Sequence, residues 1–168
     1  MLRELNLNNL LDAGCGEGVV LEKIALPQNR LAVGLDLDRS RIELARDSHL
    51  TIPFLQGNLH NLPFLDECFD TILALEVLEH VGNPDQALLE LHRVVSEYLL
   101  VSVPNEPWWR IGNMARLKYI SDWGNTPEHI NHWTYRGFKK FISRYFEIIE
   151  TRTPVLWTFI LAKKKSSQ

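Results

Sequence analysis

The chain has 168 residues, of which 45% are hydrophobic and 23% are charged, and its formal net charge is −3. This composition is typical of one globular domain, over residues 1–168, with a core of its own. The slight acidity argues against non-specific binding to nucleic acid, which usually requires a basic surface. No apolar run reaches the roughly 20 residues of a membrane-spanning helix, so we expect no stable membrane insertion. Cys15 and Cys68 indicate free thiols in the cytoplasm, because no signal peptide precedes them.

Apolar runs with the character of strands alternate with helical patterns through the first two thirds of the chain. Such alternation favours βαβ units and a parallel sheet. Asp38 or Ser40 would cap one helix, and Asn83 followed by Pro84 is a favourable start for another. The predicted elements, in chain order, are a strand at 9–12, a helix that ends before Pro27, a strand at 31–35, a helix at 39–47, strands at 52–56 and 70–75, a helix from Pro84 whose apolar stripe includes Val95, and a strand at 98–103.

The alternation stops after this last strand, and residues 104–133 contain four of the five tryptophans. A helical pattern resumes after Thr134, and two β-type runs, at 146–150 and 155–163, follow it. Parallel neighbours need a crossover of about a dozen residues. These two runs lie too close in sequence for that, so they must be antiparallel if they pair. The sequence therefore predicts a mostly parallel sheet that ends in an antiparallel hairpin.

The stretch LLDAGCGEG, at 10–18, places three glycines on alternate positions between the first strand and the first helix. Glycines here let a ligand press against the main chain, and the N-terminus of the helix offers free N–H groups to an anion. A tight turn that binds nothing is the alternative. The spacing differs from the G-x-G-x-x-G pattern of dinucleotide-binding proteins, which argues against NAD.

Two further polar residues follow neighbouring strands. Asp36 lies about 20 residues beyond the loop, where a carboxylate accepts hydrogen bonds from ribose hydroxyls. Asn58 follows the third strand, so its side chain should lie near the base that the ribose carries. Alone, Asp36 would be better explained as a helix cap, and the Gly57-Asn58 pair equally well as a turn.

Three ordered stretches, LLDAGCGEG, GLDLD and QGNLHNLPFLDECFDTILALEVLEHV, resemble the class I S-adenosylmethionine-dependent methyltransferases of the small-molecule type. The resemblance implies a doubly wound, mostly parallel seven-stranded sheet of order 3-2-1-4-5-7-6 in a three-layer αβα fold, with strand 7 antiparallel. It also implies S-adenosylmethionine as the cofactor and S-adenosylhomocysteine as the product. Asp36 would hold the ribose and Asn58 would meet the adenine edge, although many relatives have Asp at that position. The cofactor-binding residues that the resemblance implies are Asp12, Gly14, Cys15, Gly16, Gly18, Asp36, Leu37, Asn58, Leu59, Glu76 and Val77.

Methyl transfer requires alignment of the reacting atoms, exclusion of water and, for some acceptors, removal of a proton. His80, which follows the fourth strand, and His129, His132 and Tyr135 are the candidate bases, each with a purely structural role as the alternative. His129 and His132 have a spacing that can bind a metal ion, but no third ligand is evident near them, so we expect no metal site.

The tryptophan-rich segment at about 104–133 is predicted to form a lid that lines the pocket for a flat or partly apolar small molecule. A hydrophobic cap on the sheet is the alternative. Arg110, Arg116 and Lys118 would meet an acidic group of that molecule or simply face solvent. Few residues precede the first strand, whereas relatives have helices there that cover the cofactor. Either the chain is shortened, or the tryptophan segment or a neighbouring subunit, as in a homodimer, completes the cover.

The sequence therefore favours a methyltransferase that uses S-adenosylmethionine and a small-molecule acceptor. The end of the fourth strand reads Glu76-Val77-Leu78-Glu79 and lacks the Asn/Asp-Pro-Pro-Tyr motif of many enzymes that methylate nucleobase amino groups. A cofactor-binding subunit without catalysis is the second hypothesis. An NAD-dependent oxidoreductase is the third, opposed by the glycine spacing.

Overall fold

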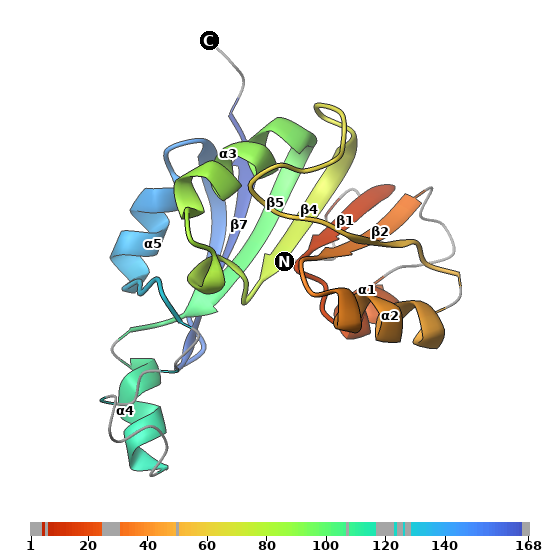
Figure 1. Ribbon diagram of the computed structural model, residues 1–168. Coiled ribbons are helices and arrows are strands. Elements are labelled where there is room, and N and C mark those ends of the chain that lie inside the picture. The colour runs from red at the N-terminus through yellow and green to blue at the C-terminus, as the bar shows by residue number, and fades with distance from the viewer. Residues whose placement is uncertain are drawn as a thin grey trace.

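A seven-stranded sheet forms the centre of the computed structural model, which describes residues 5, 7–24, 31–49, 51–106, 108–116, 123, 126 and 129–165 (Figure 1). The strand order is β3-β2-β1-β4-β5-β7-β6, as predicted. Strands β1 to β5 pair in parallel, and β7 runs antiparallel to both β5 and β6. The strands are β1 (Asn9–Ala13), β2 (Leu31–Asp36), β3 (Phe54–Gln56), β4 (Phe69–Leu75), β5 (Val95–Pro104), β6 (Phe146–Arg152) and β7 (Trp157–Lys164).

Helices cover both faces of the sheet, as expected for three αβα layers (Figure 1). The side chains of β1 alternate between the two cores: Leu11 packs with residues of α3 and α5, and Leu10 packs with residues of α1 and α2. This alternation follows from the two-residue repeat of a strand. The helices are α1 (Val19–Ile24), α2 (Arg39–Ser48), the short 3-10 helix η1 (Leu78–His80), α3 (Pro84–Val94), α4 (Trp108–Ala115) and α5 (Tyr135–Ile142).

Side-chain caps fix where two of the helices begin. Asp38, rather than Ser40, caps α2, because its carboxylate accepts a hydrogen bond from the Ser40 N–H at 2.8 Å. Asn83 caps α3 as predicted, accepting from the Gln86 N–H at 3.2 Å. The carboxyl end of β2 thus lies directly before α2, and η1 lies between the carboxyl end of β4 and α3, at the edge where ligands bind in such sheets.

Several boundaries differ from the prediction. Val95, expected in the apolar stripe of α3, is extended and begins β5, because it pairs with Phe69 at the start of β4. Strand β7 begins at Trp157 rather than 155, since the Trp157 N–H donates to the carbonyl of Pro154 in a turn. The predicted end of α1 before Pro27 lies outside the described residues.

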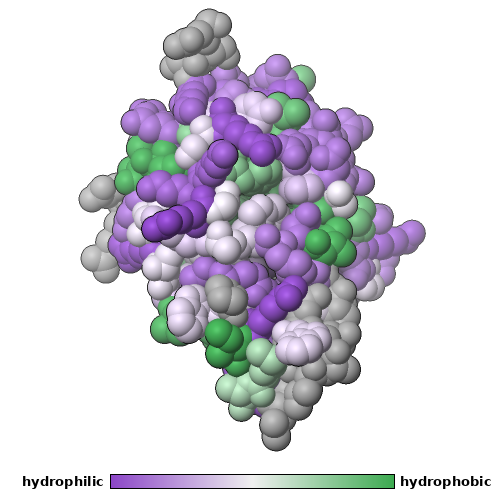
Figure 2. Space-filling model, turned by 90° about the vertical axis from the view of Figure 1, so that its left-hand side faces the viewer, coloured by the Kyte–Doolittle hydropathy of each residue, from purple (hydrophilic) through white to green (hydrophobic). Residues whose placement is uncertain are grey.

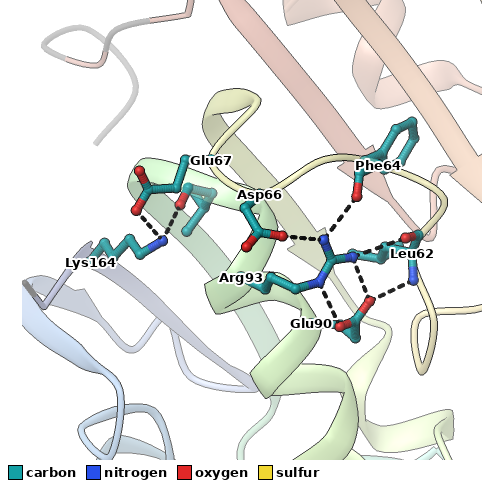
Figure 3. Close-up of polar contacts among 8 residues, drawn as sticks. Leu62, Phe64, Asp66, Glu67, Glu90, Arg93 and Lys164 are labelled. Carbon is teal, nitrogen blue, oxygen red and sulfur yellow. Dashed lines mark hydrogen bonds and ion pairs between the residues drawn. The ribbon is translucent and has the colours of Figure 1, made fainter. Parts of the chain in front are cut away.

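Arg93, near the end of α3, holds the long loop between β3 and β4 (Figure 3). Its Nη1 donates to the carbonyl of Phe64 at 2.9 Å and to Asp66 Oδ1 at 2.7 Å, and its Nη2 donates to the carbonyl of Leu62 at 3.0 Å. Glu90 lies beside the same guanidinium and accepts a hydrogen bond from the Leu62 N–H. One side chain therefore fixes three points of the loop to the helix.

The composition predicted free cysteines and no membrane-spanning helix. Cys15 and Cys68 are both free thiols, and Cys15 is buried. Among the described residues, no helix is both long and apolar enough to cross a membrane.

Candidate functional site

A cavity of about 600 Å³ opens at the carboxyl ends of β1, β2 and β4. It brings together residues that are far apart in sequence, from the glycine loop to the segment after β4. His80 lines it beside a large part of the predicted cofactor site. The predicted cofactor-binding residues that line it are Gly14, Asp36, Leu37, Asn58, Leu59, Glu76 and Val77.

The glycine loop needs glycine for its own backbone as well as for any ligand. Gly14, Gly16 and Gly18 all have positive φ angles, of 88°, 54° and 82°. A Cβ on Gly14 would lie 2.3 Å from Cγ2 of Val77, and one on Gly18 would lie 2.7 Å from the Phe54 ring. The Gly14 N–H donates to the Leu35 carbonyl at 2.7 Å. The loop is therefore held tightly against β2 and against the end of β4.

Asp36 is fixed in the cavity wall by the main chain. Its Oδ2 accepts a hydrogen bond from the Gly16 N–H at 2.8 Å, and its Oδ1 accepts from the Asp38 N–H at 2.9 Å. An ionised carboxylate has further lone pairs on both oxygens. Asp36 can therefore accept two hydroxyl donors while its position is already set, and Gly16 contributes through this contact although it does not itself line the cavity.

Asp12, at the base of the loop, is a buried carboxyl with an unsatisfied oxygen. Among the described residues, its Oδ2 has no hydrogen-bond partner. Burial, and then the charge of Asp36, raises the pKa of Asp12 to about 7. The neighbouring Cys15 thiol is buried too, and burial followed by Asp12 and Asp36 raises its pKa to about 12, so this thiol stays protonated. A cationic donor placed against Asp12 would satisfy the free oxygen.

Glu76 ends β4 in an unusual conformation and with two fixed contacts. Its φ angle is 56°, a region that residues other than glycine seldom adopt. Its Oε1 accepts from the Ser102 Oγ at 2.6 Å, and its Oε2 accepts from the Trp157 Nε1 at 2.8 Å. Burial raises the pKa of Glu76, and these two hydrogen bonds oppose the rise. Trp157, which lies 81 positions away along the chain, gave no signal in the sequence as a site residue.

Asn58 lies in the cavity wall and also makes a turn. It lines the cavity, and its Oδ1 also accepts a hydrogen bond from the His60 N–H at 2.9 Å, which makes the turn. The side-chain NH2 group and the second lone pair of Oδ1 can therefore still meet a ligand. The structure adds five lining residues that sequence reasoning missed, Asp38, Arg41, His60, Val81 and Gly82, and only their position next to the predicted residues could have indicated them.

The three candidate histidines are not equivalent. His80 alone lines the cavity, and its ring centroid lies 5.0 Å from that of His129. His129 is buried behind it and stacks on Trp109, with ring centroids 5.8 Å apart. His132 is half-buried, and its Nδ1 lies 3.7 Å from Glu106 Oε1. Tyr135, at the start of α5, is not among the lining residues, and its hydroxyl lies 3.3 Å from the Thr151 hydroxyl.

Glu79 lies within the same group of side chains. Only 1% of its surface is exposed, and neither carboxylate oxygen has a hydrogen-bond partner among the described residues. Burial, and then the nearby Glu76, raises the pKa of Glu79 to about 8. Sequence reasoning did not single out Glu79.

The tryptophan-rich segment divides into packed and exposed parts. Trp109 donates through Nε1 to the Thr126 hydroxyl and packs edge-on against Trp157, with centroids 5.5 Å apart. Trp133 packs on Phe138 and the helix α5, so it belongs to the core. Trp108 and Trp123, in contrast, are 55% and 76% exposed. Figure 1 shows α4 extending away from the sheet, and the lower end of Figure 2 carries hydrophobic residues at that level.

The basic residues of this segment have different surroundings. The Nε of Arg110 lies 3.5 Å from Glu106 Oε1, an ion pair within α4 and the turn before it. Arg116 is exposed at the end of α4. Lys118 lies outside the described residues.

Comparisons with known proteins agree with this fold. A family model described as a methyltransferase domain matches residues 11–98. A probable S-adenosylmethionine-dependent methyltransferase of Mycolicibacterium smegmatis is 34% identical over 99 residues, which is 58% of this chain and 38% of the relative. A ubiquinone biosynthesis O-methyltransferase of Rickettsia akari is 33% identical over 93 residues, 53% of this chain and 36% of the relative. The chain thus spans less than half the length of these relatives.

Solved structures match almost the whole chain. A S-adenosylmethionine-dependent methyltransferase from Methanosarcina mazei superposes with a TM-score of 0.75 at 21% identity, over 95% of this chain and 94% of that one. A chain from a complex that contains the Haloferax volcanii Trm112 methyltransferase activator gives 0.79 at 14% identity, over 97% and 85%. The family model thus covers just over half of the sequence. The same chain has the glycine loop, the acidic residue at the end of β2 and the strand order that the resemblance implies. The chain belongs to the class I S-adenosylmethionine-dependent methyltransferase family.

Proposed function

We propose that this protein transfers a methyl group from S-adenosylmethionine to a small-molecule acceptor. One observation carries the proposal: Asp36 is fixed by two main-chain donors, one of them in the glycine loop, in the wall of a cavity that Gly14 of this loop also lines. A ribose with two hydroxyls fits that carboxylate, and an amino acid fits the loop.

The features of the cavity fit the cofactor from end to end. Asp12 offers a buried, unsatisfied carboxylate oxygen to the ammonium group of the methionine part. The glycine loop, with Gly14 in the cavity wall and Cys15 and Gly18 behind it, would hold that part, and Leu37 and Leu59 would hold the adenine. Glu76 and Val77 line the cavity where β4 ends and would hold the part that carries the methyl group. When bound, S-adenosylmethionine supplies an electrophilic methyl group on a sulfonium.

The protein's own contribution is to position the acceptor, exclude water and hold a proton. His80 is the candidate base nearest the transferred group, because it lines the cavity whereas His129 and His132 do not. Burial, and then Arg110, lowers the pKa of His132, which favours its neutral form. Trp157 donates to Glu76, and Trp109 packs on Trp157, and these two rings support an aromatic or partly apolar acceptor.

The net charge of −3 supports a small molecule rather than nucleic acid as the acceptor.

Four large hydrophobic side chains of the tryptophan-rich segment are exposed, namely Trp108, Ile111, Trp123 and Ile130. They support a lid or a covering second subunit over this region, as in a homodimer. The two free cysteines support a cytoplasmic location, where thiols stay reduced.

Binding of S-adenosylhomocysteine measured by calorimetry tests the cofactor site. We expect the wild-type protein to bind it and to bind NAD far more weakly. Asp36→Ala should weaken binding about tenfold or more, because hydrogen bonds to a charged group are lost. Asp47→Ala, which removes an exposed aspartate from the neighbouring helix α2, is the matched control and should bind as the wild type does. Equal affinity of the Asp36 variant and the wild type, or tighter binding of NAD, would overturn the proposal.

Turnover distinguishes the enzyme from a cofactor-binding subunit without catalysis. A panel of small hydroxyl and amine acceptors, tested with protein that binds S-adenosylhomocysteine, should reveal methyl transfer to at least one class. Replacing His80, His129 and His132 one at a time by alanine tests the base hypothesis, and full activity in all three variants would exclude it.

A further inference from the structure

Three side chains from two distant segments converge beside the cavity. Glu79 and His80 belong to η1, and His129 lies within the tryptophan-rich segment. One ligand atom from each of the three lies within 4.8 Å of the other two. Ligands bound to one zinc ion at 2.0–2.2 Å are about 3.5 Å apart, so small rotations of these side chains bring all three to one ion.

Main-chain hydrogen bonds hold the two segments together at this point. The N–H groups of Ile130 and Asn131 both donate to the carbonyl of Glu79, each at 3.0 Å. The Asn131 side-chain amide also donates to the carbonyls of Leu78 at 3.0 Å and Val81 at 2.7 Å. These hydrogen bonds hold the backbone at residues 129–131 against η1. They place His129 next to Glu79 and His80 without any contribution from the imidazole rings.

The carboxylate of Glu79 is what distinguishes this group from an ordinary packed histidine pair. It is 99% buried, and both of its oxygens lack a hydrogen-bond partner among the described residues. A carboxylate buried without donors is strongly destabilising. A cation between Glu79 and the two imidazoles would supply the missing partner.

The geometry points to a binding site for one divalent transition-metal ion, with Glu79, His80 and His129 as its protein ligands. Two imidazole nitrogens and one carboxylate oxygen suit zinc and its first-row neighbours, whereas magnesium prefers oxygen ligands alone. The stacking of Trp109 on His129 fixes the plane of that ring. The spacing of His129 and His132 is not the basis of the site, because His132 approaches Glu106 instead.

Three protein ligands leave a fourth position open, as in catalytic zinc sites. Among the three ligands, His80 lines the cavity, and an open position on its side of the ion would face the space beside Glu76 and Val77. An acceptor oxygen that binds there would lose its proton more readily, and this consequence rests on the proposed function. His80 is then a metal ligand and not a general base. The binding of the ion itself does not depend on the proposed function.

Zinc titration of chelator-treated protein, followed by calorimetry, tests the site. The wild-type protein should bind one equivalent of Zn²⁺, and Mg²⁺ at the same concentration should give no heat. Glu79→Gln and His129→Ala should each weaken zinc binding by at least the 10–100-fold that loss of an outer partner typically causes. His132→Ala, three residues away in the same segment, is the matched control and should keep the wild-type affinity for zinc.

Titration of the same variants with S-adenosylhomocysteine shows whether they are folded, because Glu79 and His129 do not line the cavity. Unchanged zinc affinity in both variants, or loss of zinc binding in His132→Ala alone, would overturn the metal site. The absence of zinc binding by wild-type protein that still binds S-adenosylhomocysteine would also overturn it and would leave the proposed function intact. If wild-type protein binds zinc but not S-adenosylhomocysteine, the metal site would be supported and the proposed function would be overturned.

Discussion

Gly14 satisfies two separate constraints, and each can be measured. Its φ angle of 88° disfavours any side chain, and a Cβ there would lie 2.3 Å from Val77. Gly16 has a φ angle of 54°, but a Cβ there would meet nothing within 4 Å. An alanine at position 16 would thus lower stability through backbone conformation alone, whereas an alanine at position 14 would add a steric conflict.

We expect Gly14→Ala to lower the free energy of unfolding by about 2–4 kcal/mol, from strain and overpacking together. Gly16→Ala should lower it by about 1 kcal/mol, from the backbone conformation alone. Urea denaturation measures both. Equal decreases in the free energy of unfolding of the two variants would show that Val77 moves aside for a new methyl group at little cost.

At the residue scale, the motifs predicted most of the cavity lining. Asp36 and the glycines lie where a loop and an acid about 20 residues apart should lie in this fold. The contacts from distant residues could not be predicted in the same way. Trp157 reaches Glu76 across β5, and His129 reaches His80, only because the start of β7 and the segment before α5 meet the segment that follows β4. No local pattern in the sequence encodes either approach.

At the element scale, the loop between β3 and β4 depends on Arg93. This guanidinium donates to the carbonyls of Leu62 and Phe64 and pairs with Glu90 and Asp66. A lysine keeps the charge but has no planar fork that serves several acceptors at once. The beginning of the same loop carries Asn58 and Leu59 into the cavity.

We therefore expect Arg93→Lys to lower the free energy of unfolding by about 1–3 kcal/mol, since buried carbonyls lose their donors. S-adenosylhomocysteine should also bind more weakly, because the loop is no longer fixed. Arg39→Lys is the matched control: Arg39 pairs with Glu43 on the exposed side of α2, and the change should remain within about 0.5 kcal/mol. Chemical denaturation and calorimetry measure the two effects. A loss in stability without any loss in affinity would show that the loop does not position the ligand.

The strands and helices were largely predictable because each has a clear local pattern. The pairs Asp38 with Ser40 and Asn83 with Gln86 set helix starts that the sequence already indicated. Boundaries were less accurate where strand pairing decides them. Val95 has helical neighbours and an apolar side chain, but its partner Phe69 on β4 extends it. Pairing partners lie far away in sequence, so a local pattern cannot identify them.

At the scale of the whole molecule, Asp12 makes stability depend on pH. Its pKa rises from a usual value of 3.8 to about 7 in the folded chain, through burial and then through Asp36. Because the folded state holds this proton more tightly than the unfolded state, the contribution of Asp12 is fully present below pH 3.8. It is lost as the pH rises through about 7.

The difference between the two pKa values corresponds to about 4 kcal/mol in the free energy of unfolding. Asp12→Asn should therefore gain stability relative to the wild type as the pH rises from about 4 to 8, and urea denaturation at several pH values measures the gain. Glu79 shifts stability in the same direction, so the difference between the variant and the wild type, not the wild-type curve, isolates Asp12. A difference that does not vary with pH would mean that Asp12 is already ionised at low pH. Bound S-adenosylhomocysteine should reduce the effect, because its ammonium favours the charged carboxylate.

The overall strand order was available from the sequence only through the family resemblance. The short connection between the last two strands predicted the antiparallel hairpin, and β6 and β7 do pair in that way. Nothing local in the sequence indicated that β7 would insert between β5 and β6. Side-chain periodicity defines which face of a strand is buried, but it does not specify the neighbour in the sheet.

All described residues that line the cavity fall between Gly14 and Gly82. The chain after β5 reaches that region mainly through Trp157 and through the clamp of Ile130 and Asn131 on Glu79. The first half of the chain therefore builds the cavity wall, and the second half supports it from outside. A segment that replaced the second half would have to pair with β5 as β7 does and to present two amides to the carbonyl of Glu79.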